Sequence, residues 1–70
     1  MINYQLSINS FISLKIYNLL GQEIATLVNE AQQPGLHEVK WDASNVPSGV
    51  YFYRLQAGKY TETKKLLLIR

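Results

Sequence analysis

Residues 46–58 read VPSGVYFYRLQAG, and this stretch decides the fold class of the 70-residue chain. A Pro-Ser-Gly turn leads into a segment with apolar residues at every second position, namely Tyr51, Tyr53, Leu55 and Ala57. Residues two apart share one face of a β-strand, and aromatic side chains favour strands. Gly58 then stands where a tight hairpin turn would follow. The stretch therefore predicts a strand over 50–57.

The same alternation occurs before this stretch and predicts further strands over 2–8, 11–17 and 36–41. A last strand is predicted over 60–69, where the first half is polar and the second half is apolar. The apolar faces of the first two would be Ile2, Tyr4, Leu6 and Ile8, then Ile12, Leu14 and Ile16. Trp41 would be the large core anchor of the strand over 36–41. Turn signals such as Gln33-Pro34-Gly35 separate the segments.

Residues 22–33 allow two interpretations. Their apolar residues continue a helix-like stripe that would support a helix over 15–33. Gly21 lies within that stripe and disfavours a helix by about 1 kcal/mol relative to Ala. The segment also holds β-branched residues, which lose side-chain freedom in a helix. We therefore favour a strand over 23–28, and short strands separated by turns predict an all-β sandwich or barrel.

The composition excludes several classes of function. The chain has 47% hydrophobic and 17% charged residues, a net charge of +2, no cysteine and one histidine. Such a small positive charge does not indicate nucleic-acid binding. No apolar run approaches the about 20 residues of a membrane span, and no signal peptide is recognisable. A domain of this size is near the lower limit for folding alone, so we expect support from a neighbouring domain or a partner.

The aromatic run 51–53 has two interpretations. It could be a stacking platform for a base or a sugar. Alternatively, it is a core strand in which the Tyr51 hydroxyl bonds to backbone at a sheet corner, as in immunoglobulin-like sandwiches. We favour packing, because aromatic side chains so regular along a strand usually belong to a core.

Other candidate sites are weaker. His37, Glu38 and Asp42 suggest acid–base chemistry, but His37 and Glu38 point to opposite faces of one strand and no nucleophile accompanies them. One histidine without cysteine does not supply a metal site. Basic residues interleave with tyrosines in the last third, but a solvated strand face explains them equally; they are Arg54, Lys59, Lys64, Lys65 and Arg70. We therefore expect no enzyme activity, cofactor, metal or nucleic-acid partner.

Residues 66–69 are four consecutive apolar residues that need burial on both faces. Either a partner covers this strand or adds a strand to its edge, or the strand is central in a two-sheet sandwich. The sequence leaves both explanations open.

Several motifs resemble one family in the right order. They are LKIYNLLGQEI at 14–24, PSGVY at 47–51, and Lys64-Lys65 followed by four apolar residues and Arg70. The chain looks like the C-terminal sorting domain (type A) of cargo proteins of the type IX (Por) secretion system of Bacteroidetes and relatives. The resemblance implies a small immunoglobulin-like antiparallel β-sandwich of about six to seven strands. It would form a single domain over 1–70, cut from a larger secreted protein.

The resemblance also implies a function. The domain would direct an upstream cargo domain, in cis, across the periplasm to the outer-membrane surface or the medium. An outer-membrane translocon would recognise the domain, and a surface sortase would remove it. The signal residues carried over from the family are Pro47, Gly49, Tyr51, Lys65, Leu66, Leu67, Leu68, Ile69 and Arg70.

The chain departs from the family pattern near its start. The Asn-Pro-rich segment that often opens the family is missing, and Ser7 replaces the usual proline. The open edge left by such a gap would favour a homodimer of the isolated fragment. The alternative function is an immunoglobulin-like structural or adhesion module that stays in the mature protein and binds protein or glycan. Cleavage from the cargo separates the two functions.

Overall fold

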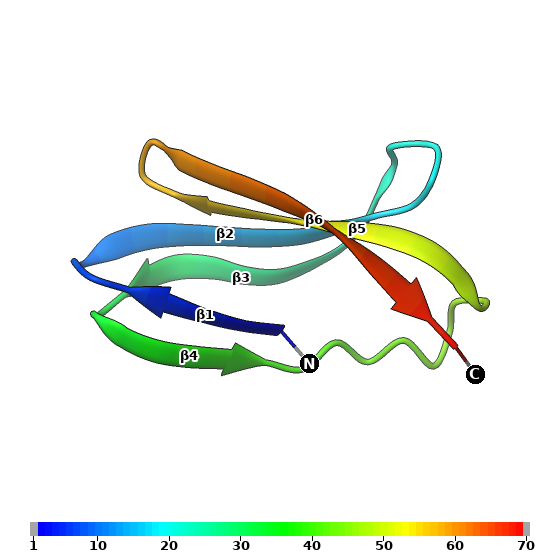
Figure 1. Ribbon diagram of the computed structural model, residues 1–70, viewed down its shortest axis with the longest axis horizontal. Coiled ribbons are helices and arrows are strands. Elements are labelled where there is room, and N and C mark those ends of the chain that lie inside the picture. The colour runs from blue at the N-terminus through cyan, green and yellow to red at the C-terminus, as the bar shows by residue number, and fades with distance from the viewer. Residues whose placement is uncertain (1, 70) are drawn as a thin grey trace.

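The computed structural model describes residues 2–69, which form six strands and no helix. The strands are β1 (Ile2–Leu6), β2 (Ser10–Tyr17), β3 (Glu23–Gln32), β4 (Gly35–Val39), β5 (Gly49–Ala57) and β6 (Tyr60–Leu68). β1 pairs with β4, and a four-stranded sheet has the order β3-β2-β5-β6 (Figure 1). Every pairing is antiparallel. The predicted all-β class is confirmed as a small β-sandwich. Within the described range, no helix could cross a membrane.

The core lies between the two sheets and is centred on β2. Ile12, Leu14 and Ile16 on the inner face of β2 have no exposed surface. Three side chains of β1 belong to the same buried cluster, namely Ile2, Tyr4 and Leu6. The predicted alternation of both strands is thus confirmed over these residues. Ile8 was expected on the same face but is 67% exposed, because β1 ends at Leu6 and Ile8 lies in the connection to β2.

β3 is the segment for which the apolar pattern allowed either a helix or a strand. Its register against β2 shifts between the pairs Leu14–Val28 and Lys15–Thr26, and again between Ile16–Ala25 and Tyr17–Glu23. Leu27 and Ile24 are therefore the extra residues of two bulges. Each bulge adds one residue to the two-residue period of the strand. Partly buried side chains of β3 therefore recur at spacings that resemble those of a helix. The favoured strand is confirmed, and it continues beyond residue 28 to Gln32.

The strand predicted over 36–41 extends beyond the C-terminal end of the observed strand β4. β4 stops at Val39, which pairs with Ile2, the first described residue of β1. Trp41 therefore lies in the connection to β5 and has no ladder partner. Its half-buried ring still packs against the core, where it meets the ring of Tyr51 edge-on, with centroids 5.4 Å apart and planes at 73°. The core role predicted for Trp41 is confirmed, but its place in a strand is wrong.

Replacing the central core residue tests this account of packing. Leu14→Ala should lower the free energy of unfolding by about 2–5 kcal/mol, because it removes a fully buried side chain and leaves a cavity. Leu36→Ala is the matched control, since Leu36 is 82% exposed on β4; its effect should stay within about 0.5 kcal/mol. Urea unfolding followed by Trp41 fluorescence measures both variants. Equal losses in the two variants would contradict the assignment of the core.

Candidate recognition site

Tyr51 closes the turn that leads into β5. Its hydroxyl donates a hydrogen bond to the carbonyl oxygen of Pro47, 2.6 Å away and four residues earlier. Its side chain is buried in the core cluster. This is the corner arrangement expected from the sequence, in which a tyrosine ties the chain entering a strand to that strand. Pro47 and Tyr51 therefore act together, whereas Gly49 is already the first residue of β5 and pairs with Leu68.

The aromatic run 51–53 does not form a stacking platform. Tyr51 is buried and Tyr53 packs partly buried against the core, so both lie on the inner face of β5. Phe52, between them, lies on the outer face, because successive side chains of a strand point to opposite sides. The three rings share no surface on which a base or a sugar could stack.

Most of the predicted signal segment 65–69 belongs to β6. Because β6 pairs with the start of β5, the segment lies beside the Pro47–Tyr51 corner. The ladder between β5 and β6 joins Gly49–Leu68, Val50–Leu67, Tyr51–Leu66 and Phe52–Lys65. Two motifs that are separated in the sequence are thus brought together by one strand pairing. Ile69 follows the end of β6 and is exposed. Arg70, the last of the predicted signal residues, lies outside the described residues.

Strand alternation divides this segment into two kinds of side chain. Leu66 and Leu68 pack partly buried against the core. Lys65 and Leu67 lie on the outer face of the sheet and are exposed. β6 is at the edge of its sheet, with β5 as its one neighbour. The explanation that placed the last strand at the centre of a sheet is therefore wrong. A partner at this strand stays a prediction.

The family model described as secretion system C-terminal sorting domain matches residues 1–69. This chain belongs to that family. The match confirms the resemblance seen in the sequence, which named the sorting domain of type IX secretion. No curated protein and no solved structure matches the chain with significance. The sorting domain thus serves in general terms as a C-terminal secretion signal.

In the sorting domain, the residues considered for acid–base chemistry are engaged elsewhere. The ring of His37 stacks on that of Tyr4, with centroids 5.2 Å apart, and its Nε2 lies 2.8 Å from the carbonyl oxygen of Gln33. The Asp42 carboxylate accepts a hydrogen bond from the backbone N–H of Ser44 at 3.1 Å. Over residues 2–69, no three His, Asp or Glu side chains gather where they could hold a metal ion.

The basic residues near the end of the chain are divided between the two faces of the sheet. Lys64 lies on the inner face and makes an ion pair of 3.0 Å with Glu62, which also accepts a hydrogen bond from the Tyr60 hydroxyl. These two donors lower the pKa of Glu62. Arg54 and Lys65 lie on the outer face, as their pairing positions require. The tyrosines and cations therefore do not form one nucleic-acid surface.

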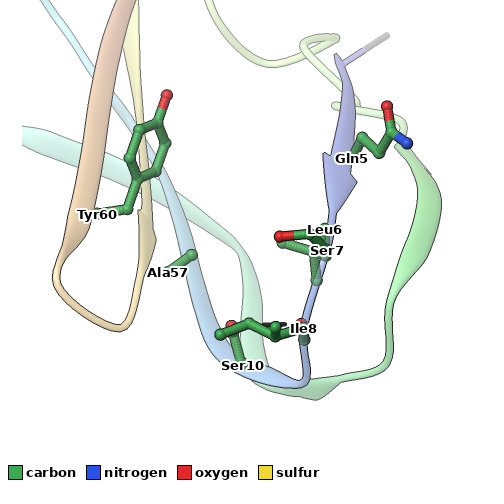
Figure 2. Close-up of a pocket in the computed structure, with 7 residues that line it drawn as sticks. All are labelled: Gln5, Leu6, Ser7, Ile8, Ser10, Ala57 and Tyr60. Carbon is green, nitrogen blue, oxygen red and sulfur yellow. Dashed lines mark hydrogen bonds between the residues drawn. The ribbon is translucent and has the colours of Figure 1, made fainter.

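The sequence did not reveal a groove at the opposite end of the sandwich. It runs between the end of β1 and the β5–β6 hairpin, as Figure 2 shows, with a volume of about 330 Å³. Its lining residues are Gln5, Leu6, Ser7, Ile8, Ser10, Ala57 and Tyr60. None of these lining residues is a histidine, a carboxylate or a lysine, so the lining itself supplies no base to activate the two serines.

Shortening Tyr51 tests the corner. Tyr51→Phe should lower the free energy of unfolding by about 1 kcal/mol, because it removes one hydrogen bond and keeps the ring. Tyr51→Ala should unfold the sorting domain, because it also removes the ring that packs against Trp41. Chemical denaturation and circular dichroism measure the two effects. A folded Tyr51→Ala variant with the midpoint of the parent would refute the corner's structural role.

The exposed carboxylates give the domain a defined response to acid. Hydrogen bonds from Lys15 and Thr26 lower the pKa of Glu23, and those from Tyr60 and Lys64 lower the pKa of Glu62, both from 4.5. A lowered folded-state pKa gives stability that is present above 4.5 and lost as the pH falls through the folded-state value.

The double variant Glu23→Gln/Glu62→Gln should therefore lose less thermal stability than the parent between pH 5 and pH 3. Melting curves in low salt measure this difference, and high salt should shrink it because both ion pairs are exposed. Identical pH profiles for the two proteins would show that these contacts contribute nothing.

Proposed function

We propose that this chain is the sorting signal at the end of a larger cargo protein, which it directs through the type IX secretion system to the cell surface or the medium. The observation that carries the proposal is the family match over residues 1–69. The structure supports it by placing the two family motifs side by side, through the pairing of β5 with β6.

The proposed partners are an outer-membrane translocon, met after passage to the periplasm, and a surface sortase that removes the domain. The signal residues would be Pro47, Gly49, Tyr51, Arg70 and the segment 65–69. The structure suggests two roles within this set. Tyr51, Leu66 and Leu68 maintain the fold, because they pack in or against the core. Lys65, Leu67 and Ile69 are available to a partner, because they are exposed.

An export assay tests the proposed function. Residues 1–70 are fused behind a signal peptide and a fluorescent reporter, in a bacterium with a working type IX system and in a mutant that lacks it. We expect fluorescence at the surface or in the medium of the competent strain alone, and a shift in reporter size if a sortase removes the domain. Retention of a folded fusion in the periplasm of both strains would instead favour the adhesion module that stays in the mature protein.

Deleting residues 66–70 from the same fusion should abolish export. The deletion removes Leu66 and Leu68 from the core as well as exposed residues, so resistance to protease in the periplasm must be measured beside export. A deletion fusion that is folded and exported like the parent would refute the role of this segment.

A further inference from the structure

The outer face of the four-stranded sheet carries apolar side chains near the end of β6. Phe52 pairs with Tyr17 on one side and with Lys65 on the other, so these three side chains form one row across the sheet. Val50 and Leu67 form the next row. Leu67 is 61% exposed. No strand of the described chain covers this face, because β1 and β4 pack on the inner side.

The β2–β3 turn adds two leucines to this surface. Asn18 holds the turn: its Oδ1 accepts hydrogen bonds from the backbone N–H groups of Leu20 and Gln22, at 2.9 and 3.0 Å. Gly21 takes a positive φ of 81° that other residues rarely adopt. The turn is thus ordered, yet Leu19 and Leu20 are 68% and 83% exposed. These two apolar side chains extend the apolar surface of the outer face, and a contiguous apolar surface is typical of an interaction site.

Two shallow hollows join the turn to the sheet. One, of about 210 Å³, is lined by residues that include Tyr17, Leu19, Phe52 and Arg54. The other lies between the turn and the start of β5, and Leu19, Leu20 and Val50 contribute to it. Leu19 lines both, so the surface is continuous. We call the set Leu19, Leu20, Phe52, Arg54, Lys65 and Leu67 the outer patch. Figure 1 shows the β2–β3 turn and the end of β6 at the same end of the molecule.

The charges of this face indicate which charged groups a partner would present to it. Within residues 2–69, the cations of this face are Lys15, Arg54 and Lys65, and its one carboxylate is Glu23, which makes a 3.1 Å ion pair with Lys15. Among residues 2–69, Arg54 and Lys65 have no carboxylate partner. Arg54 instead lies over the Tyr17 ring, 5.0 Å from its centroid, and both residues line the hollow of about 210 Å³.

We propose that the outer patch is the surface by which the sorting domain contacts the secretion machinery, and that the contacted protein presents apolar side chains beside carboxylates. This inference rests on the proposed function and adds the contact surface and its chemistry. A second copy of the chain fits less well, because the one carboxylate that this face carries within residues 2–69 is already paired with Lys15, so a like face offers no free carboxylate to Arg54 and Lys65. The apolar part would supply affinity, and the cations would set orientation and encounter rate.

The export fusion tests the patch with exposed substitutions. Leu67→Glu and the pair Arg54→Glu/Lys65→Glu should each reduce export at least tenfold. Leu36→Glu is the matched control, because Leu36 is a more exposed leucine in a strand of the other sheet; its export should equal that of the parent. Thermal midpoints within a few degrees of the parent show that loss of export is not loss of folding.

The outcomes separate the patch from the proposed function. If the parent fusion is not exported, the proposed function fails and the inference fails with it. If the parent is exported and the patch variants match it, the inference alone is overturned. Two other occupants have their own readouts. Light scattering that shows a parent dimer and a Leu67→Glu monomer would assign the patch to self-association. Binding of the parent, but not the charge-reversed variant, to phosphatidylglycerol vesicles would assign it to a lipid surface.

Discussion

The burial of three alternate side chains of β2 is the interaction on which the rest of the structure depends. Ile12, Leu14 and Ile16 are fully buried, and β2 has a paired strand on each side. Burying aliphatic side chains is the main favourable term in a chain without disulfides. The other strands are placed by this requirement, since β3 and β5 extend the sheet that holds β2, and β1 covers its apolar face.

The sheet formed by β1 and β4 is smaller than the four-stranded sheet that it covers. This difference in size explains why β6 is only half buried and why a groove opens beside it. A sheet of two strands packs on a sheet of four, so the strand farthest from the covered region is only half buried. β6 is that strand, and its inner face changes from Leu66 and Leu68 beside the core to Tyr60, Glu62 and Lys64 where the cover ends. The groove between β1 and the β5–β6 hairpin is the other result of the same mismatch.

Sequence reasoning succeeded where one physical rule acted alone. Period-two alternation located β1, β2 and β5, and the proline-glycine turn placed the Tyr51 corner, because both depend on local geometry. The rule failed at Ile8 and Trp41, where a partner strand rather than propensity sets the end of the ladder. It was ambiguous for β3, because bulges at Leu27 and Ile24 replace the strand period by a helix-like one. The neighbours of Phe52 on the sheet could not be predicted from the sequence, since they belong to strands whose pairing is long-range.

The alternation of the last strand also changes what kind of signal this segment is. In an extended, unpaired chain, residues 65–69 are only a basic and apolar run. Pairing with β5 turns Leu66 and Leu68 inward and sets Lys65 and Leu67 beside Phe52 and Val50. A surface of that composition exists only when the β5–β6 ladder is formed. If a partner reads this surface, recognition depends on folding, and export would select domains whose sandwich is complete. A linear tail signal would carry no such dependence.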